Sequence, residues 1–167
     1  MVKRTRSFID DPWRKASVLM FEDVLSRDQG VGFAHYWFYK LDFALWYEQK
    51  RDHALWGNFC FTAKNSVEHI SPQHPRDTDA NKVSKDWLNC FGNLALVSCS
   101  INSKYGNLPF NEKRQRFLNK LELEKRPDSL KMALIYSSEV WGDDLAEIHQ
   151  REMLVALRRH YDRDFDV

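Results

Sequence analysis

The runs SVEHI, residues 66–70, and LALV, residues 94–97, decide how the rest of this chain is interpreted. Apart from the Glu68-His69 pair both runs are largely apolar, and Gly and Pro residues lie around them. A polar loop at residues 74–85 separates the two. Short apolar runs bounded by turn-forming residues are typical of β-strands. We therefore expect two short strands joined by a polar loop.

The segment before these runs has the periodicity of a helix. Five apolar residues recur at helical spacing and share one helix face: Phe33, Trp37, Leu41, Ala44 and Leu45. Phe38, Phe43 and Trp46 lie outside this stripe. A helix that is apolar on so many sides is expected at the centre of the core.

The segment after the runs also has a helical pattern. Pro127-Asp128-Ser129 interrupts it, and a new helix is expected where Asp143 and Asp144 follow Gly142. Acidic residues favour a helix start because they oppose the positive end of the helix dipole. The chain is therefore expected to be helical on both sides of the two strands.

Together these patterns predict an α+β fold that is mostly helical and has a small ββα core. A length of 167 residues fits one domain. We expect an N-terminal helical segment at residues 1–56, the ββα core at 57–126 and a C-terminal helical segment at 127–167.

The composition is that of a globular protein in water. Hydrophobic residues make up 43% of the chain and charged residues 29%, which excludes a disordered protein. No apolar run reaches the ~18 residues of a membrane span, and no apolar stretch follows the basic N-terminus as in a secretory signal. We expect a cytoplasmic protein with no membrane contact. The three cysteines form no CxxC pair, so neither a disulfide framework nor a structural zinc site is expected.

The net charge is only +1, so any surface that binds nucleic acid has to be local. Lys104, Lys113, Arg114 and Arg116 follow Asn102, near which a helix is expected to begin. A helix N-terminus and nearby cations together can hold phosphate. We predict a nucleic-acid contact there, and a solvated helix face is the alternative.

The Glu68-His69 pair and the later Asn93 and Asn102 have the chemistry that phosphodiester hydrolysis needs. A histidine can take a proton from water near neutral pH. Carboxylate and amide oxygens are ligands that Mg²⁺ accepts, so Glu68 and Asn102 are the candidate ligands. Neighbours on a strand point to opposite sides, which lets one face a metal while the other faces water.

Simpler interpretations compete with these assignments. His69 could be a structural histidine, and His74 is then the next candidate for a base. Asn93 could brace a turn, and Asn102 could cap the start of a helix. The joint presence of an acid-His pair and both asparagines favours the catalytic interpretation.

Several motifs in order resemble the HNH endonuclease superfamily, the ββα-metal or His-Me finger enzymes, in its zinc-free form. Asn93 and Asn102 are nine residues apart, as in the last two positions of that motif. Three motifs resemble the C-terminal nuclease domain of GmrSD type IV restriction enzymes: EHISPQ at 68–73, GNLALVS at 92–98 and INSKYGNLPFNEK at 101–113. The resemblance covers roughly residues 30–162.

The resemblance implies a role for each matching residue. His69 stands at the general base, Glu68 at the acidic metal ligand and Asn102 at the second metal ligand. Asn93 matches the central asparagine of the catalytic motif, and in the family this residue braces the loop that holds the base. Asn107 and Lys113 match an extension of the motif, and we expect a structural hydrogen bond and a phosphate contact respectively, with both residues near the nucleic acid.

The resemblance also implies a function. We expect a DNA endonuclease that uses one divalent metal, Mg²⁺ or Mn²⁺, in restriction of foreign DNA. A ParB-like nucleotide-dependent domain or subunit is an implied partner, and nothing in this chain resembles one. A catalytically inactive nucleic-acid-binding module, or a subunit of a larger restriction complex, is the alternative. A helical scaffold with no active site would place Glu68 and Asn102 far apart.

Overall fold

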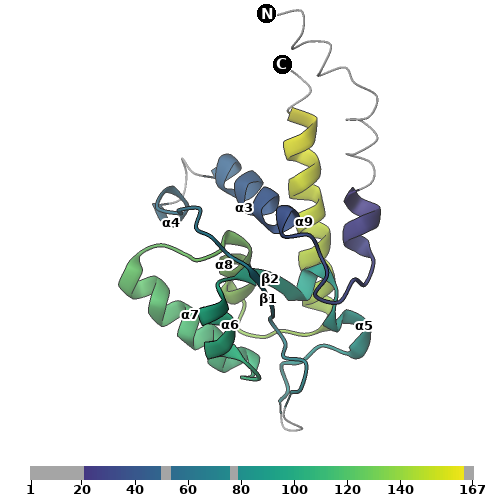
Figure 1. The fold of residues 1–167 in the computed structure, drawn as a ribbon, viewed down its shortest axis with the longest axis vertical. Coiled ribbons are helices and arrows are strands. Elements are labelled where there is room, and N and C mark those ends of the chain that lie inside the picture. The colour runs from purple at the N-terminus through teal and green to yellow at the C-terminus, as the bar shows by residue number, and fades with distance from the viewer. Residues whose placement is uncertain (1–20, 50–53, 76–78, 164–167) are drawn as a thin grey trace, which may run out of the picture.

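The computed structural model describes residues 21–49, 54–75 and 79–163, and it has the α+β, mostly helical architecture expected (Figure 1). Predictions for residues 1–20 therefore lie outside the described residues. The elements in chain order are α3 (His35–Gln49), α4 (Ala54–Gly57), β1 (Ser66–His69), α5 (Lys85–Leu88), the 3-10 turn η1 (Phe91–Asn93), β2 (Leu94–Val97), α6 (Cys99–Tyr105), α7 (Phe110–Glu124), α8 (Leu130–Ser137) and α9 (Asp143–Arg163). No helix in these ranges is long and apolar enough to cross a membrane.

The two strands that the sequence predicted, β1 and β2, pair as a two-stranded antiparallel sheet. The sheet lies at the centre of the molecule, with α3 and α9 on one side and α6 and α7 on the other (Figure 1). All of β2 is buried because Leu94 and Leu96 pack into one hydrophobic cluster while Ala95 and Val97 pack into a second. Burial on both faces explains why β2 is a continuous apolar run rather than an alternating one.

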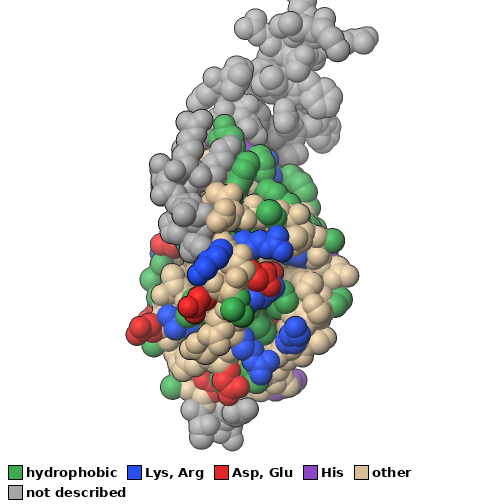
Figure 2. All heavy atoms as spheres, turned by 90° about the vertical axis from the view of Figure 1, so that its left-hand side faces the viewer, with side chains coloured by type: hydrophobic (Ala, Val, Ile, Leu, Met, Phe, Trp, Pro, Cys, Tyr) green, Lys and Arg blue, Asp and Glu red, His purple; other side chains and the backbone are tan. Residues whose placement is uncertain are grey.

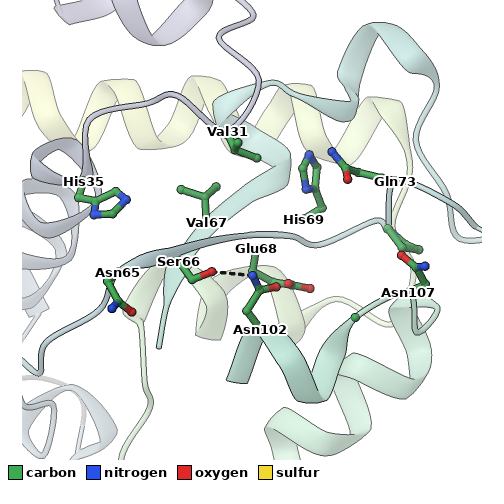
Figure 3. A pocket seen from close by; sticks show the side chains of 12 residues that line it. Val31, His35, Asn65, Ser66, Val67, Glu68, His69, Gln73, Asn102 and Asn107 are labelled. Atoms are coloured by element: carbon green, nitrogen blue, oxygen red, sulfur yellow. Dashed lines mark hydrogen bonds between the residues drawn. The ribbon is translucent and has the colours of Figure 1, made fainter. Parts of the chain in front are cut away.

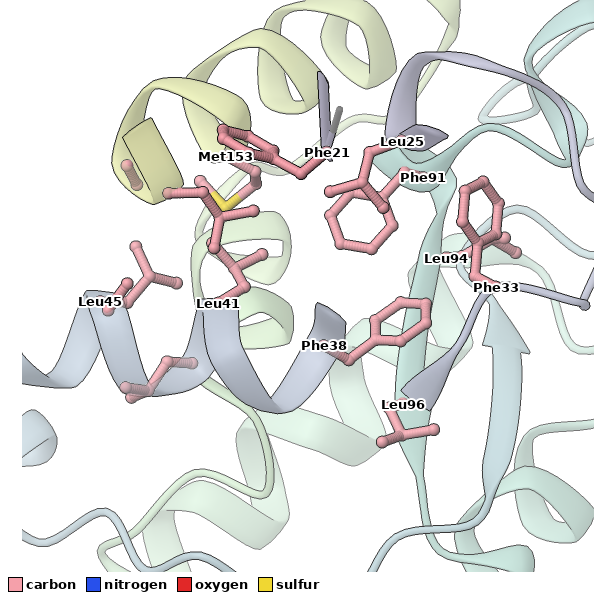
Figure 4. Packing of buried hydrophobic residues seen from close by; sticks show 14 of the residues in the cluster. Phe21, Leu25, Phe33, Phe38, Leu41, Leu45, Phe91, Leu94, Leu96 and Met153 are labelled. Carbon is pink, nitrogen blue, oxygen red and sulfur yellow. The ribbon is translucent and has the colours of Figure 1, made fainter. Parts of the chain in front are cut away.

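The first cluster packs α3 and α9 against the sheet (Figure 4). Leu41, Ala44 and Leu45 of α3 are buried in it, which confirms the predicted apolar stripe. Phe33 is also buried, but it precedes α3, so it belongs to the connection before the helix. Phe38 is buried from outside the stripe, which fits a helix covered on several sides.

Close packing of α9 sets the position of η1, the turn that leads into β2. A Cβ atom at Gly92 would lie 2.2 Å from the carbonyl oxygen of Ala146 on α9, so only glycine fits there. The backbone N–H of Gly92 donates to the side-chain oxygen of Gln150, also on α9. Helix α9 begins at Asp143, as predicted, and contacts η1 through residues of its first two turns.

A buried carboxylate joins α3 to α8 and to the chain that enters β1. Asp42 lies 3.0 Å from the ammonium of Lys64, two residues before β1. Its Oδ1 atom also accepts hydrogen bonds from the backbone N–H groups of Leu130 and Lys131 at 3.0 and 3.1 Å. These are unpaired donors of the first turn of α8, so Asp42 acts as a cap from a distant part of the chain.

Helix α6 completes a ββα arrangement, but it does not begin where the sequence analysis placed it. It starts at Cys99, and the Ser98 side chain caps it by accepting from the backbone N–H of Ile101. Asn102 therefore lies inside the helix. The alternative interpretation of Asn102 as a helix cap is wrong, and so is the expectation that a helix N-terminus lies beside it.

Candidate active site

A pocket of about 510 Å³ opens beside β1 (Figure 3). Four residues singled out from the sequence line it: Glu68, His69, Asn102 and Asn107. The first two come from β1, and Asn102 comes from α6. The chain thus brings the acid, the candidate base and the candidate amide ligand to one cavity, which does not fit a scaffold that holds Glu68 and Asn102 apart.

The two neighbours at the end of β1 face different parts of this pocket. His69 lies on one side of the strand, and Glu68 lies on the other side with Asn102 (Figure 3). Side chains alternate along a strand, so this division follows from the strand itself. A reacting group held at the strand end can then meet the imidazole from one side and the oxygen ligands from the other.

The imidazole of His69 is oriented by an amide that the sequence analysis did not single out. Its Nε2 atom lies 3.1 Å from the Oδ1 atom of Asn89, just after α5. An amide oxygen accepts, so Nε2 carries the proton and Nδ1 keeps its lone pair. Burial lowers the pKa of His69, and the charge of Lys113 lowers it further, while the Asn89 hydrogen bond opposes both. The ring is therefore neutral near pH 7, as a base must be.

Glu68 forms a buried ion pair inside the site. Its Oε1 atom lies 2.7 Å from the Nζ atom of Lys113, and the two side chains are 3% and 0% exposed. The same Nζ donates to the backbone carbonyl of His69 at 2.6 Å. Burial raises the pKa of Glu68 and lowers that of Lys113, and their mutual attraction opposes each shift.

This placement corrects the role expected for Lys113. A lysine in the basic run after Asn107 was expected to contact phosphate, but its ammonium is completely buried and has no surface to offer a ligand. Lysines are almost never fully buried unless they are paired. The pair is with Glu68, so Lys113 belongs to the interior of the site.

Asn93 braces the turn before β2. Its Oδ1 atom accepts from the backbone N–H of Ser71 at 2.9 Å and from the indole N–H of Trp141 at 3.0 Å. Its Nδ2 atom donates to the carbonyl of Leu88 at 2.8 Å. Asn93 is fully buried and is not among the residues that line the pocket, so its contribution is to position the base and not to touch a substrate.

A second buried lysine holds the same turn. The Nζ atom of Lys131 donates to the carbonyls of Phe91 and Leu94, which flank Asn93. Burial lowers the pKa of Lys131 to about 7, and the charge of Asp42 opposes the shift. Both strands of the sheet are therefore anchored at one end by a buried ammonium, Lys113 for β1 and Lys131 for β2.

Asn102 and Glu68 offer oxygen atoms that suit a hard divalent cation. The Nδ2 atom of Asn102 donates to the hydroxyl of Ser66 at 2.6 Å (Figure 3), which turns its Oδ1 atom away from that contact. Within the described ranges, no group of three or more His, Cys, Asp or Glu side chains could hold a metal ion. The fit therefore rests on one carboxylate and one amide oxygen, with the remaining positions left to water and substrate.

The basic residues predicted to contact nucleic acid do not line this pocket. Lys104 and Arg116 line a second pocket of about 690 Å³, and α6 contributes residues to both cavities. Arg116 donates to the carbonyl of Lys104 at 2.8 Å. Arg114 instead donates to the carbonyls of Tyr136 and Ser138 at the end of α8.

The nucleic-acid contact predicted for Lys104, Lys113, Arg114 and Arg116 therefore does not lie in the pocket that His69 lines. On the face that carries α4, α6 and α7, Lys and Arg side chains are interspersed with acidic ones (Figure 2). Glu124 and Asp128 share the second pocket with the basic residues. Lys3, Arg4 and Arg6 of the basic N-terminus are another candidate for a cationic DNA contact, and they lie outside the described residues.

Several polar residues of the first pocket were not predicted. His35, Asn65 and Gln73 line it beside the expected residues. His35 is the first residue of α3, and nothing in the local sequence links it to β1. Gln73 is the last residue of the EHISPQ motif, but no role was predicted for it. His74, the alternative base, is exposed and is not among the residues that line the pocket.

A known family matches most of the chain. The family model described as GmrSD restriction endonucleases, C-terminal domain, matches residues 21–155. That range includes β1, β2, α6 and every residue assigned to the pocket. No curated protein and no solved structure matches the chain.

Proposed function

Because the chain belongs to the family of GmrSD restriction endonuclease C-terminal domains, we propose that it hydrolyses DNA phosphodiesters as an HNH-type, metal-dependent endonuclease. The observation that carries the proposal is the convergence of Glu68, His69 and Asn102 on one pocket. These are an acid, a neutral imidazole and an amide, the groups that the reaction requires.

His69 is the general base of the proposed reaction. Its Nδ1 atom takes a proton from a water molecule while the water oxygen forms a bond to phosphorus. The bond from phosphorus to the leaving oxygen breaks, and that oxygen receives a proton from solvent. Asn89 holds the Nε2–H group and keeps the ring in the tautomer whose Nδ1 atom is basic.

Glu68 and Asn102 would hold a single divalent cation, Mg²⁺ or Mn²⁺. The cation would stabilise the negative charge that develops on the phosphate and leaving oxygens. Of the two carboxylate oxygens, Oε1 is engaged by Lys113, so Oε2 is the oxygen left for a ligand. Ser66 supports the assignment of Asn102, because its contact with Nδ2 orients the amide.

DNA as the substrate, and restriction as the biological role, come from the family and not from the pocket. A ParB-like nucleotide-dependent partner stays a prediction on the same ground. A cytoplasmic location likewise stays a prediction.

A plasmid-nicking assay tests the proposed function. The wild-type chain should nick supercoiled DNA with Mg²⁺ or Mn²⁺ and lose the activity when EDTA is added. His69→Ala should lose about 10²–10⁴-fold in rate and still bind DNA, since phosphate contacts dominate affinity. The matched control is His74→Ala, which should keep full activity. DNA binding without nicking by the wild type would favour the inactive-module alternative.

A further inference from the structure

The charge balance of the pocket decides how strongly it can attract a cation. Among the described residues that line it, Glu68 is the only carboxylate, and the other polar groups are neutral amides, a hydroxyl and two imidazoles. That one carboxylate is already paired with the buried ammonium of Lys113 at 2.7 Å. The pair has no net charge, so the pocket attracts a cation far less than a bare carboxylate would.

Lys113 cannot move aside to restore the negative charge. It is completely buried, and a second bond ties its ammonium to the carbonyl of His69 at 2.6 Å. These two contacts hold the ammonium at the point where the strand ends, where it repels a second cation. Breaking the pair would also leave an uncompensated buried charge.

Affinity for a hard divalent cation depends on how many charged oxygens surround it. Mg²⁺ commonly binds through one or two carboxylates together with phosphate oxygens of the substrate. Here one neutralised carboxylate and one amide are present, so a phosphodiester is the natural source of the missing negative charge.

We propose that the site takes up its divalent cation together with the nucleic-acid phosphate, and that the Lys113–Glu68 pair keeps it from binding the cation tightly beforehand. The inference rests on the proposed function and adds an order of assembly to it. Lys113 is a positioning residue, since it cannot reach the substrate. The cation and the phosphate each raise the affinity of the site for the other, and the two factors are equal by linkage.

The test measures binding rather than hydrolysis. The His69→Ala chain, which should cut its ligand only slowly, is titrated with Mn²⁺ alone and with Mn²⁺ plus a DNA duplex, and bound Mn²⁺ is followed by electron paramagnetic resonance. The duplex should tighten Mn²⁺ binding by about tenfold or more, and saturating Mn²⁺ should tighten DNA binding by the same factor. Equal Mn²⁺ affinity with and without the duplex overturns the inference.

A second variant changes the charge of the pocket without disturbing its interior. Asn102→Asp, made in the same background, adds a second carboxylate at the proposed ligand position. It should tighten Mn²⁺ binding in the absence of DNA by about tenfold, since ligand charge sets affinity. The matched control is Asn119→Asp on the exposed face of α7, which should leave Mn²⁺ binding unchanged. Equal effects of the two variants, or none from Asn102→Asp, contradict the inference.

Lys113→Met tests the ammonium directly. Lys131→Met is its control, because that lysine is equally buried and bonds to backbone carbonyls but does not contact Glu68. If both variants remain folded by circular dichroism, only Lys113→Met should bind Mn²⁺ more tightly without DNA. Weaker or unchanged binding by Lys113→Met contradicts the role given to its charge.

Failure of this inference can be told apart from failure of the proposed function. If the wild type nicks DNA only with Mg²⁺ but binds Mn²⁺ tightly in the absence of DNA, the proposed nuclease function stands and only the proposed order of assembly is wrong. If the wild type neither nicks DNA nor binds Mn²⁺, with or without DNA, both the proposed function and the proposed order of assembly are wrong.

Discussion

The Nζ atom of Lys113 lies 2.7 Å from the Oε1 atom of Glu68, and the same nitrogen lies 2.6 Å from the carbonyl oxygen of His69. Adjacent strand residues point their side chains to opposite sides, so one cation can join them only through a side chain of one and the backbone of the other. Helix α7 thereby holds both the acid and the base of the candidate site.

Loss of this cation should destabilise the protein strongly. Lys113→Ala leaves Glu68 buried and unpaired, and the free energy of unfolding should fall by about 3–5 kcal/mol in urea titrations. Lys120→Ala removes an ion pair to Asp128 that is partly open to solvent and should cost at most about 1 kcal/mol. The double variant Glu68→Gln, Lys113→Met should lose less stability than the sum of the losses measured for Glu68→Gln and for Lys113→Met alone. Additive losses would mean that the two groups do not interact.

The pH dependence of hydrolysis should report the buried imidazole. The base must be neutral, and burial lowers the pKa of His69 below its ordinary value of 6.5. The single-turnover rate should therefore hold down to pH values below 6.5 and fall only as the pH drops through the lowered pKa. Asn89→Leu removes the hydrogen bond that raises this pKa, so the fall should move to lower pH while the plateau rate decreases. A wild-type profile that falls above pH 6.5 would assign the base to another group.

The two motif asparagines should respond differently to replacement by alanine. Asn93→Ala leaves the N–H groups of Ser71 and Trp141 without their acceptor in the interior, and stability should fall by at least about 2 kcal/mol. Asn102→Ala removes one contact to Ser66 and should cost under about 1 kcal/mol, yet it should abolish Mn²⁺ binding in the presence of DNA. A large stability loss with intact Mn²⁺ binding for Asn102→Ala would make that residue structural.

The salt dependence of DNA binding should locate the cationic contacts. Lys104 and Arg116 are exposed and line one cavity next to α6, so their joint replacement by alanine should lower the salt slope by at most about two. Affinity should fall similarly for all sequences, as measured by fluorescence anisotropy. Lys82→Ala with Lys85→Ala is the charge-matched control, because neither residue lines either pocket. Equal salt slopes in the two double variants would mean that Lys104 and Arg116 do not contact DNA and belong to a solvated surface.

Local sequence was enough to place much of the fold. The end of β1, the bounds of β2, the buried stripe of α3 and the start of α9 at Asp143 all follow from features within a few residues of each position. Strand runs, helical periodicity and acidic first turns are local signals, so they can be recognised without knowing which distant segments pack against them. The convergence of Glu68, His69 and Asn102 on one pocket also agrees with the spacing of the motif.

The identity of each polar partner depended on packing between distant segments. Lys113 had the sequence context of a surface lysine, and only its contact with a strand 44 residues earlier makes it an interior cation. Asp42 caps a helix that begins 88 residues later, and Asn89 reaches His69 from the far end of a polar loop. A buried charge or amide requires a partner, but which group supplies it is set by where the helices pack and not by the residues beside it.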